Sequence, residues 1–261
     1  MISKSEILKQ LEPFKLALGK PVIVHTSLRA IGEIEGGGDT LLSCLIEFFT
    51  QNGGLLCIPT HTWDKEMLDL REKHTCLGTL PSLALKRADA VRTMHPTHSM
   101  VVFGEREKVS AFIDGEDLVD TPTSPNGCYG KIFNEGGFVL LIGVGQEKNT
   151  FLHCVEEMLC VPKRLTKEKR EFPIIYENGE CKAKKLYWFY TDEIEDVSEN
   201  FGKFEAAFDF HGAITYGKLG NAKLQLCSAQ KMKDIIEFIY NRNDFKELLA
   251  DNLPLNEALY K

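Results

Sequence analysis

The clearest pattern in the chain is the alternation of short apolar runs with helical spacing over its first 160 or so residues. Buried strands are predicted at 21–24, 55–58 and 138–142, each bounded by glycine or polar residues. A helix that starts at the cap residue Asp39 and ends near Gln51 separates the first two strands. This strand–helix–strand order is typical of a βαβ unit with parallel strands.

The rest of the chain shows weaker patterns. Ser3 and Glu6 form a capping box for a helix over residues 4–18. Asn178-Gly179, flanked by 171–177 and 181–190, indicates a β-hairpin with a two-residue turn. Further helices are predicted at 80–87, 106–113, 126–134, 150–159, 193–204 and 228–239, and further strands at 101–103 and 223–226, before a polar, partly helical tail at 243–261. We therefore expect a single α/β domain over residues 1–261: a mixed, largely parallel central sheet flanked by helices, with a β-hairpin segment near 170–190.

Composition narrows the choice of partners. Of the 261 residues 43% are hydrophobic, which is enough for a sizeable core, and the formal net charge is −7. An acidic chain argues against nucleic-acid binding and suits a cationic small molecule. The sequence contains no stretch of about 18 apolar residues, so it predicts no membrane span.

The eight cysteines favour a reducing compartment. None of them forms a CxxC pair, and several lie inside apolar runs, such as Cys57. The chain also starts without an apolar signal region. We expect buried, reduced thiols and a cytoplasmic protein.

Polar residues collect where the predicted strands end. His25-Thr26-Ser27 follows the first strand, Thr60-His61-Thr62 the second, and Gly143-Val-Gly145 the third. In open α/β sheets the ligand crevice lies outside the carboxyl ends of the strands. We therefore expect the binding site there.

His153 and Glu156 are three residues apart in a predicted helix and so share one face, with Asn149 one turn earlier. A carboxylate beside an imidazole fixes its tautomer and stabilises the imidazolium, as a general base requires. An ordinary ion pair on a helix has the same spacing, and on the residues alone it is the commoner explanation.

Two other motifs have equally good structural explanations. His95-Pro96-Thr97-His98-Ser99 either orders a substrate or thioester, or is a rigid turn before a strand. Gly36-Gly37-Gly38 before a helix can present backbone N–H groups to a phosphate. It lacks the Walker lysine and the spaced glycines of a dinucleotide fingerprint, so an ordinary tight turn fits as well.

Taken together, the motifs occur in the order found in one known family. They are His25-Thr-Ser-Leu28 with Gly36-Gly37, Pro59-Thr-His-Thr-Trp63, Arg92-Thr-Met-His-Pro-Thr-His-Ser99, Ser124-Pro125 with Gly130-Lys131, Gly137 to Gly145, Asn149-Thr-Phe-Leu-His153 with Glu156, and Gly217-Lys-Leu-Gly220-Asn-Ala222. Over roughly residues 20–225 the chain resembles the aminoglycoside 3-N-acetyltransferase family, which differs in fold from the GNAT acetyltransferases.

The resemblance implies an N-acetyltransferase with acetyl-CoA as co-substrate, a primary amine of an aminoglycoside or related metabolite as acceptor, and no metal. It implies that the coenzyme is held by the His25–Leu28 segment (His25, Thr26, Ser27, Leu28) and by Gly36 and Gly37, to which we add Arg92 and Ser99. It places His153 at the acceptor amine as general base and Glu156 as its orienting partner, and we add Asn149 and His98 to this catalytic group. A loop N–H or the hydroxyl of Thr150 or Ser99 is the candidate oxyanion donor.

The chain departs from the family pattern in two places. Residues 64–73 are mixed in charge where family members often carry an acidic stretch, and Asn149 stands where an aspartate also occurs. An aminoglycoside, with antibiotic resistance as the consequence, is therefore one of several possible amine substrates. The sequence also leaves a homodimer open.

Three alternatives compete with this interpretation. A zinc hydrolase could use His61, His95 and His98 with Glu156, although Pro96 disfavours a helical His-x-x-His pair. A protein that binds coenzyme A without turnover would keep the same motifs. A cysteine nucleophile would be Cys154 or Cys128, but Cys154 directly follows His153 and so points elsewhere on the helix.

Overall fold

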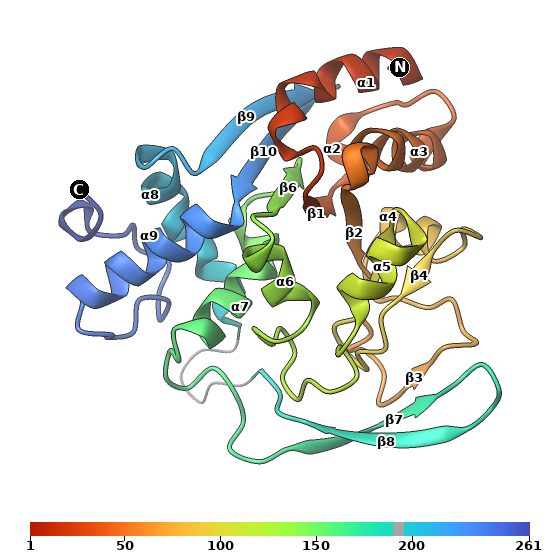
Figure 1. The fold of residues 1–261 in the computed structure, drawn as a ribbon. Coiled ribbons are helices and arrows are strands. Elements are labelled where there is room, and N and C mark those ends of the chain that lie inside the picture. The colour runs from red at the N-terminus through yellow and green to blue at the C-terminus, as the bar shows by residue number, and fades with distance from the viewer. Residues whose placement is uncertain (190–195) are drawn as a thin grey trace.

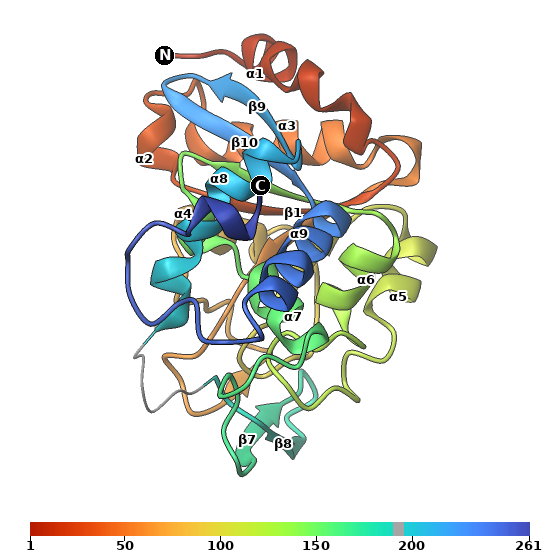
Figure 2. The same ribbon diagram turned by 90° about the vertical axis from the view of Figure 1, so that its left-hand side faces the viewer.

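The computed structural model describes residues 1–189 and 196–261. A seven-stranded sheet in the order β4-β5-β2-β1-β6-β10-β9 forms the centre, and Figures 1 and 2 show helices packed on its two sides. Its strands are β1 (Pro21–Thr26), β2 (Leu55–Pro59), β4 (Val91–Arg92), β5 (Met100–Phe103), β6 (Phe138–Ile142), β9 (Ile214–Leu219) and β10 (Ala222–Ser228). A smaller sheet consists of β3 (Leu68–Asp69), β7 (Arg170–Ile175) and β8 (Cys181–Leu186). The predicted α/β fold with a mixed sheet is confirmed.

The parallel part of the sheet is narrower than predicted. β1 pairs in parallel with β2 and β6, whereas the flanking strands β5, β4, β10 and β9 all pair antiparallel. The pattern did not predict β9, because this edge strand is half exposed and carries no apolar run. Its connection to β10 is a tight turn at Gly220, whose φ of 57° is in the left-handed region that favours glycine.

Alternate residues of the central strands build two cores. Val22 and Val24 face one side, which is covered by α1, α3 and α4, while Ile23 faces the other, covered by α5 to α9. The helices are α1 (Lys4–Leu11), α2 (Leu28–Ile31), α3 (Gly37–Phe49), α4 (Thr79–Ala84), α5 (Arg106–Ile113), α6 (Cys128–Asn134), α7 (Phe151–Met158), α8 (Glu205–Phe210) and α9 (Ala229–Arg242), with 3₁₀ segments at Glu12–Ala17, Gln51–Gly53, Gln146–Lys148, Val197–Phe204 and Glu257–Leu259. None of the helices described in residues 1–189 and 196–261 is long and apolar enough to cross a membrane.

Several predicted ends shift for local reasons. The helix predicted at 4–18 changes to 3₁₀ geometry after Leu11, where Pro13 has no N–H to continue the α-helical hydrogen bonds. The cap of α3 is Gly36, with φ 74°, rather than Asp39, which lies in the first turn. The helix predicted at 193–204 is a 3₁₀ helix from Val197, and residues 193–195 lie outside the described residues.

The predicted hairpin is present, but its loop has three residues and not the predicted two-residue Asn178-Gly179 turn. β7 and β8 pair antiparallel through Ile175 and Cys181, and the Tyr176 N–H donates to Glu180 O at 2.8 Å, so residues 177–179 form the loop. Gly179, with φ 83°, takes the left-handed position that ends such a loop. Figure 1 shows this hairpin along the lower edge of the molecule, beside β3, which pairs with β7. Tyr190, placed by the prediction at the end of its second strand, lies outside the described residues. A single domain over residues 1–261 stays a prediction.

Candidate active site

A cavity of about 610 Å³ opens at the carboxyl ends of β1, β2 and β6. These three strands contribute the inner wall, and the outer wall comes from α4 with the preceding loop, the aromatic residues after β8 and residues 196–199. The lining from the three strand ends consists of Val24, His25, Thr26, Pro59, His61, Trp63, Val144, Glu147, Lys148, Thr150 and His153. The cavity thus lies where parallel strands place a ligand crevice, as the strand-end motifs predict.

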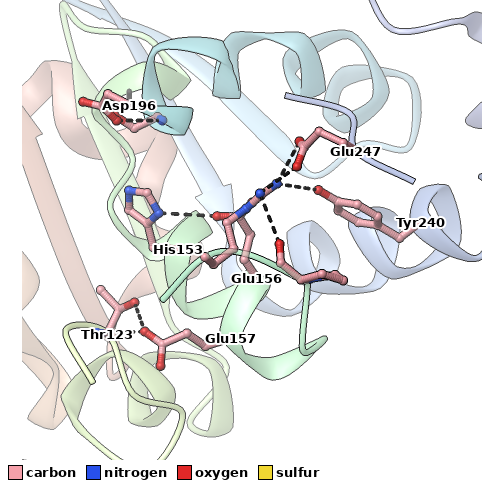
Figure 3. Close-up of polar contacts among 10 residues, drawn as sticks. Thr123, His153, Glu156, Glu157, Asp196, Tyr240 and Glu247 are labelled. Atoms are coloured by element: carbon pink, nitrogen blue, oxygen red, sulfur yellow. Dashed lines mark hydrogen bonds and ion pairs between the residues drawn. The ribbon is translucent and has the colours of Figure 1, made fainter. Parts of the chain in front are cut away.

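His153 reaches the cavity from the first turn of α7. Its Nδ1 lies 3.4 Å from Oε2 of Glu156, one turn later, and Figure 3 shows the two side chains facing one another. Neither atom has a hydrogen-bond partner among the described residues. The ring stacks on Phe189 with centroids 4.2 Å apart and meets Phe201 in an edge-type contact with centroids 4.8 Å apart. The predicted pair is therefore brought together at the cavity wall, with the imidazole in contact with two aromatic rings.

Glu156 is almost fully buried, and a cation holds its second oxygen. Arg164 donates from Nε to Glu156 Oε1 at 2.6 Å. The same guanidinium binds Glu247 through both Nη atoms, at 2.7 and 2.9 Å. Burial lowers the pKa of Arg164, but its hydrogen bonds to Glu247 and Glu156 outweigh burial and raise it. Arg164 therefore stays charged and keeps the Glu156 carboxylate in place.

A second group of histidines follows β2 and precedes β5, beside the same cavity. The rings of His61 and His98 are 4.5 Å apart, and His98 packs edge-on against Phe189 at 5.2 Å. His61 Nε2 pairs with the Tyr129 hydroxyl at 2.9 Å, and His98 Nδ1 with the Thr97 hydroxyl at 3.0 Å. Burial lowers the pKa of both imidazoles well below the usual range. Both rings are thus neutral at pH 7.

The third histidine of this motif is structural. His95 Nε2 donates to Thr121 O at 3.0 Å, and Nδ1 accepts from the backbone N–H of His98 at 2.9 Å and of Thr97 at 3.3 Å. Burial lowers its pKa to about 3. Among the described residues, no group of three or more His, Cys, Asp or Glu side chains is arranged to hold a metal ion. The zinc interpretation therefore has no ligand set in the part of the chain that the structure describes.

Arg92 and Ser99 are occupied by the loops around them. Arg92 donates to Ser99 Oγ, to Thr60 O and to His74 O at 3.0–3.1 Å, and the Ser99 hydroxyl donates to Thr60 O at 2.9 Å. Burial lowers the pKa of Arg92 to about 10. Neither residue is among the described residues that line the cavity. Their hydrogen bonds instead hold the surrounding loops together.

Other predicted residues divide between cavity and core. His25 and Thr26 line the cavity, whereas Ser27, Leu28, Gly36 and Gly37 do not appear in its described lining. Asn149 points into the core, where its Nδ2 donates to Gln146 Oε1 at 2.8 Å and lies 3.5 Å from Met232 Sδ. Of the predicted catalytic group, the structure thus brings His153, Glu156 and His98 around one cavity, without Asn149.

Three polar atoms on the strand side have no partner in the described structure. His25 Nε2, Thr26 Oγ1 and His61 Nδ1 are buried without a hydrogen bond, and burial lowers the pKa of His25 to about 4, which leaves the ring neutral. Buried polar atoms in a native protein are normally hydrogen-bonded, so this wall is suited to polar ligand groups such as the amides and carbonyl of an acyl thioester.

Sequence reasoning missed several lining residues. Trp188 and Phe189 sit at the end of the hairpin, and the aromatic run from Tyr187 was the available indication of a wall. Arg164 offered no such indication, since it lies in a lysine- and arginine-rich stretch that looks solvated. Its role depends on a contact with Glu247, 83 residues away.

Comparison with known proteins identifies the family of the chain. The family model described as "Aminoglycoside 3-N-acetyltransferase" matches residues 23–240. The chain is 24% identical, over 94% of its length and 95% of the relative's, to an aminoglycoside N(3')-acetyltransferase-like protein from a Bacillus subtilis prophage. It is 25% identical to aminoglycoside N(3)-acetyltransferase III of Serratia marcescens, over 84% of this chain and 89% of that one.

Solved structures share the fold. Aminoglycoside acetyltransferase AAC(3)-IVa in complex with a gentamicin superimposes with a TM-score of 0.77 at 24% identity, over 93% of this chain and 89% of that chain. The binary complex of AAC-IIIb with CoASH gives 0.76 at 20% identity, over 92% and 97%. With a family model that covers most of its length, and with this cavity and its His–Glu pair, the chain belongs to the aminoglycoside 3-N-acetyltransferase family.

Proposed function

We propose that this protein transfers the acetyl group of acetyl-CoA to a primary amine, with His153 as the general base and Glu156 as the residue that orients it. The observation that carries the proposal is the pairing of His153 Nδ1 with the buried Glu156 carboxylate at the wall of the 610 Å³ cavity. A carboxylate in this position favours the tautomer that carries its proton on Nδ1 and leaves Nε2 to accept one.

The chemistry follows from the state of the acceptor. An ammonium group has no lone pair, so it must lose a proton before its nitrogen can attack the thioester carbonyl. His153 accepts a proton as the N–C bond forms, which is the role of a general base. The C–S bond then breaks, and the CoA thiolate leaves and takes up a proton.

The strand side of the cavity suits the acetyl-CoA donor. On the strand side, His25 and Thr26 offer unpaired polar atoms to the thioester and pantetheine amides. Thr150, at the start of α7, also lines the cavity and is the better placed of the two hydroxyl candidates for the oxyanion, because the Ser99 hydroxyl already donates to Thr60 O.

The acceptor is a cationic amine. Glu147, Asp196 and Glu199 line the cavity, and their charge favours cations, although Lys148 pairs with Glu199 at 3.3 Å. A solved relative holds a gentamicin. An aminoglycoside is therefore the first acceptor to test, followed by smaller aminated metabolites.

A screen of amines with acetyl-CoA, read by release of free CoA thiol, tests the proposal. We expect amine-dependent release and an N-acetylated product by mass spectrometry. Isothermal calorimetry with CoA, without added metal, provides the control for donor binding. If CoA binds and no amine in a broad panel causes release, the protein is a CoA-binding module without turnover and the proposed function is wrong.

A further inference from the structure

We propose that Glu247, in the segment after α9, is a positioning residue of the active site: it holds Arg164, and Arg164 holds Glu156 against His153. This inference deepens the proposed function and rests on it. The family model matches only residues 23–240, so Glu247 lies in a part of the chain outside that match. Figure 3 shows the continuous series of contacts from Glu247 to His153.

The end of α7 directs Arg164 back toward its own helix. Cys160 has a φ of 52°, Val161 N donates to Glu156 O at 2.9 Å, and Cys160 N donates to Glu157 O at 3.1 Å. These are the two hydrogen bonds of a Schellman motif, which reverses the chain at a helix end. Lys163 also has a left-handed φ of 61°. The chain therefore folds under α7, and Arg164 meets Glu156, eight residues earlier.

Apart from Glu247, the Nη atoms of Arg164 have only long contacts among the described residues, to Pro162 O at 3.4 Å and to the Tyr240 hydroxyl at 3.5 Å, which leave the guanidinium free to turn about its bond to Glu156. Glu247 binds both Nη atoms and so fixes the plane of the group, which leaves Nε directed at Glu156 Oε1. Only 4% of the Arg164 side chain and 2% of the Glu156 side chain are exposed, whereas 27% of Glu247 is. Glu247 is thus the partly accessible end of a buried ion-pair network.

Charge gives Glu247 a second effect. Two carboxylates share one guanidinium, so the network of Glu156, Arg164 and Glu247 carries a net negative charge that stabilises an imidazolium at His153. Without the charge of Glu247, Arg164 would be balanced by Glu156 alone, and less of that negative charge would act on the base.

The other ionisable groups around His153 are the same in both variants. Glu157, on α7, is turned toward Thr121 and Thr123. Neutral His61 and His98 lie at the same cavity, and the charged side chains that line it are Glu147, Lys148, Asp196 and Glu199. The segment itself is held in place, because Leu249 N donates to Glu247 Oε1 at 2.7 Å and Asn200 Nδ2 donates to Leu249 O at 2.8 Å.

The test is Glu247→Gln in the full chain, with Glu257→Gln as the matched control. Glu257 lies in the same C-terminal segment, and among the described residues its side chain pairs with Lys261 at the surface. We expect Glu247→Gln to lower kcat about tenfold, which is within the range for small displacements of catalytic groups. The KM for the amine should change little, and the acidic limb of the pH profile of kcat/KM should move to lower pH, because the imidazolium is less stabilised. Glu257→Gln should behave as wild type.

Two further measurements keep the inference testable. In ¹⁵N spectra, which need no turnover, the His153 ring signals should move in Glu247→Gln and stay in place in Glu257→Gln. Arg164→Lys keeps the charge but cannot bridge two carboxylates in this geometry, so it should reproduce the loss in kcat. Unchanged kcat, pH profile and ring signals in a folded Glu247→Gln would overturn the inference. A wild type without acetyltransferase activity would contradict the proposed function, and the ring signals would still decide whether Glu247 positions the pair.

Discussion

Two groups of histidines beside one cavity lie in opposite environments. On the β2–β5 side, His61, His95 and His98 are packed against one another, and among the described groups their ring partners are hydroxyls and backbone atoms. On the β6 side, His153 faces the carboxylate of Glu156, which an arginine holds in place. Burial without a counter-charge keeps an imidazole neutral, whereas a carboxylate partner lets it accept a proton. Histidine content alone therefore does not locate a base.

Replacing the base should have the largest effect. We expect His153→Ala to lower kcat by about 10²–10⁴, the usual loss for a general base, while CoA binding by calorimetry stays near that of wild type. His98→Ala is the comparison from the other group of histidines. If His153→Ala keeps full activity across pH 6–8 and His98→Ala is inactive, the assignment of His153 as the base is wrong.

Removing only the charge of the partner should cost less. Glu156→Gln keeps the imidazole and the side-chain shape, so we expect kcat to fall by up to about 10²-fold. Glu157→Gln is the matched control, because Glu157 turns away from the cavity and accepts from the Thr123 hydroxyl at 2.7 Å and from the Thr121 hydroxyl. Equal losses in the two variants would mean that burial of a carboxylate on α7, and not its contact with His153, matters.

The buried, neutral state of His95 should make the stability of the protein depend on pH. His95 has a pKa of about 3 in the folded chain and about 6.5 when unfolded. Its contribution is complete above pH 6.5 and is lost as the pH falls toward 3, because the unfolded chain takes up a proton that the folded chain does not. The free energy of unfolding should fall by up to about 1.4 kcal/mol per pH unit from this group. Denaturant unfolding of His95→Gln at pH 7, 6 and 5 should show a shallower slope than wild type, and equal slopes would contradict this assignment.

The smallest effect is expected from chelation. Dialysis against EDTA should leave kcat unchanged, because the ring nitrogens of His95 are already hydrogen-bonded and no described cluster offers a ligand set. Elemental analysis of the dialysed protein is the control. If activity is lost on dialysis and zinc restores it, His61, His95 and His98 would again be candidate zinc ligands.

The residues that sequence could predict are those whose neighbours are close in the chain. His153 and Glu156 are one turn apart, so helical spacing was enough to pair them. Strand-end polarity likewise placed His25 and Thr26 at the cavity. Arg164, Glu247 and Tyr129 were not predicted, because their contacts join segments 68–83 residues apart. Arg92 and Ser99 were assigned to the coenzyme from a motif, while their contacts are with loop carbonyls, which composition cannot distinguish from a ligand.

The two adjacent glutamates of α7 also limit how this protein can change. Glu156 is bound to Arg164 and Glu157 to the Thr121–Thr123 loop, so the helix is locked in rotation on two sides. Each residue of an α-helix advances it by about 100°. A one-residue insertion or deletion ahead of Phe151 would turn His153, Glu156 and Glu157 together by about 100°, so that Glu156 would lose Arg164, Glu157 would lose the Thr121–Thr123 loop, and His153 would turn away from the cavity. New acceptor specificity should therefore arise through changes in the loops opposite α7, such as that before α4, where length can vary without disturbing the base.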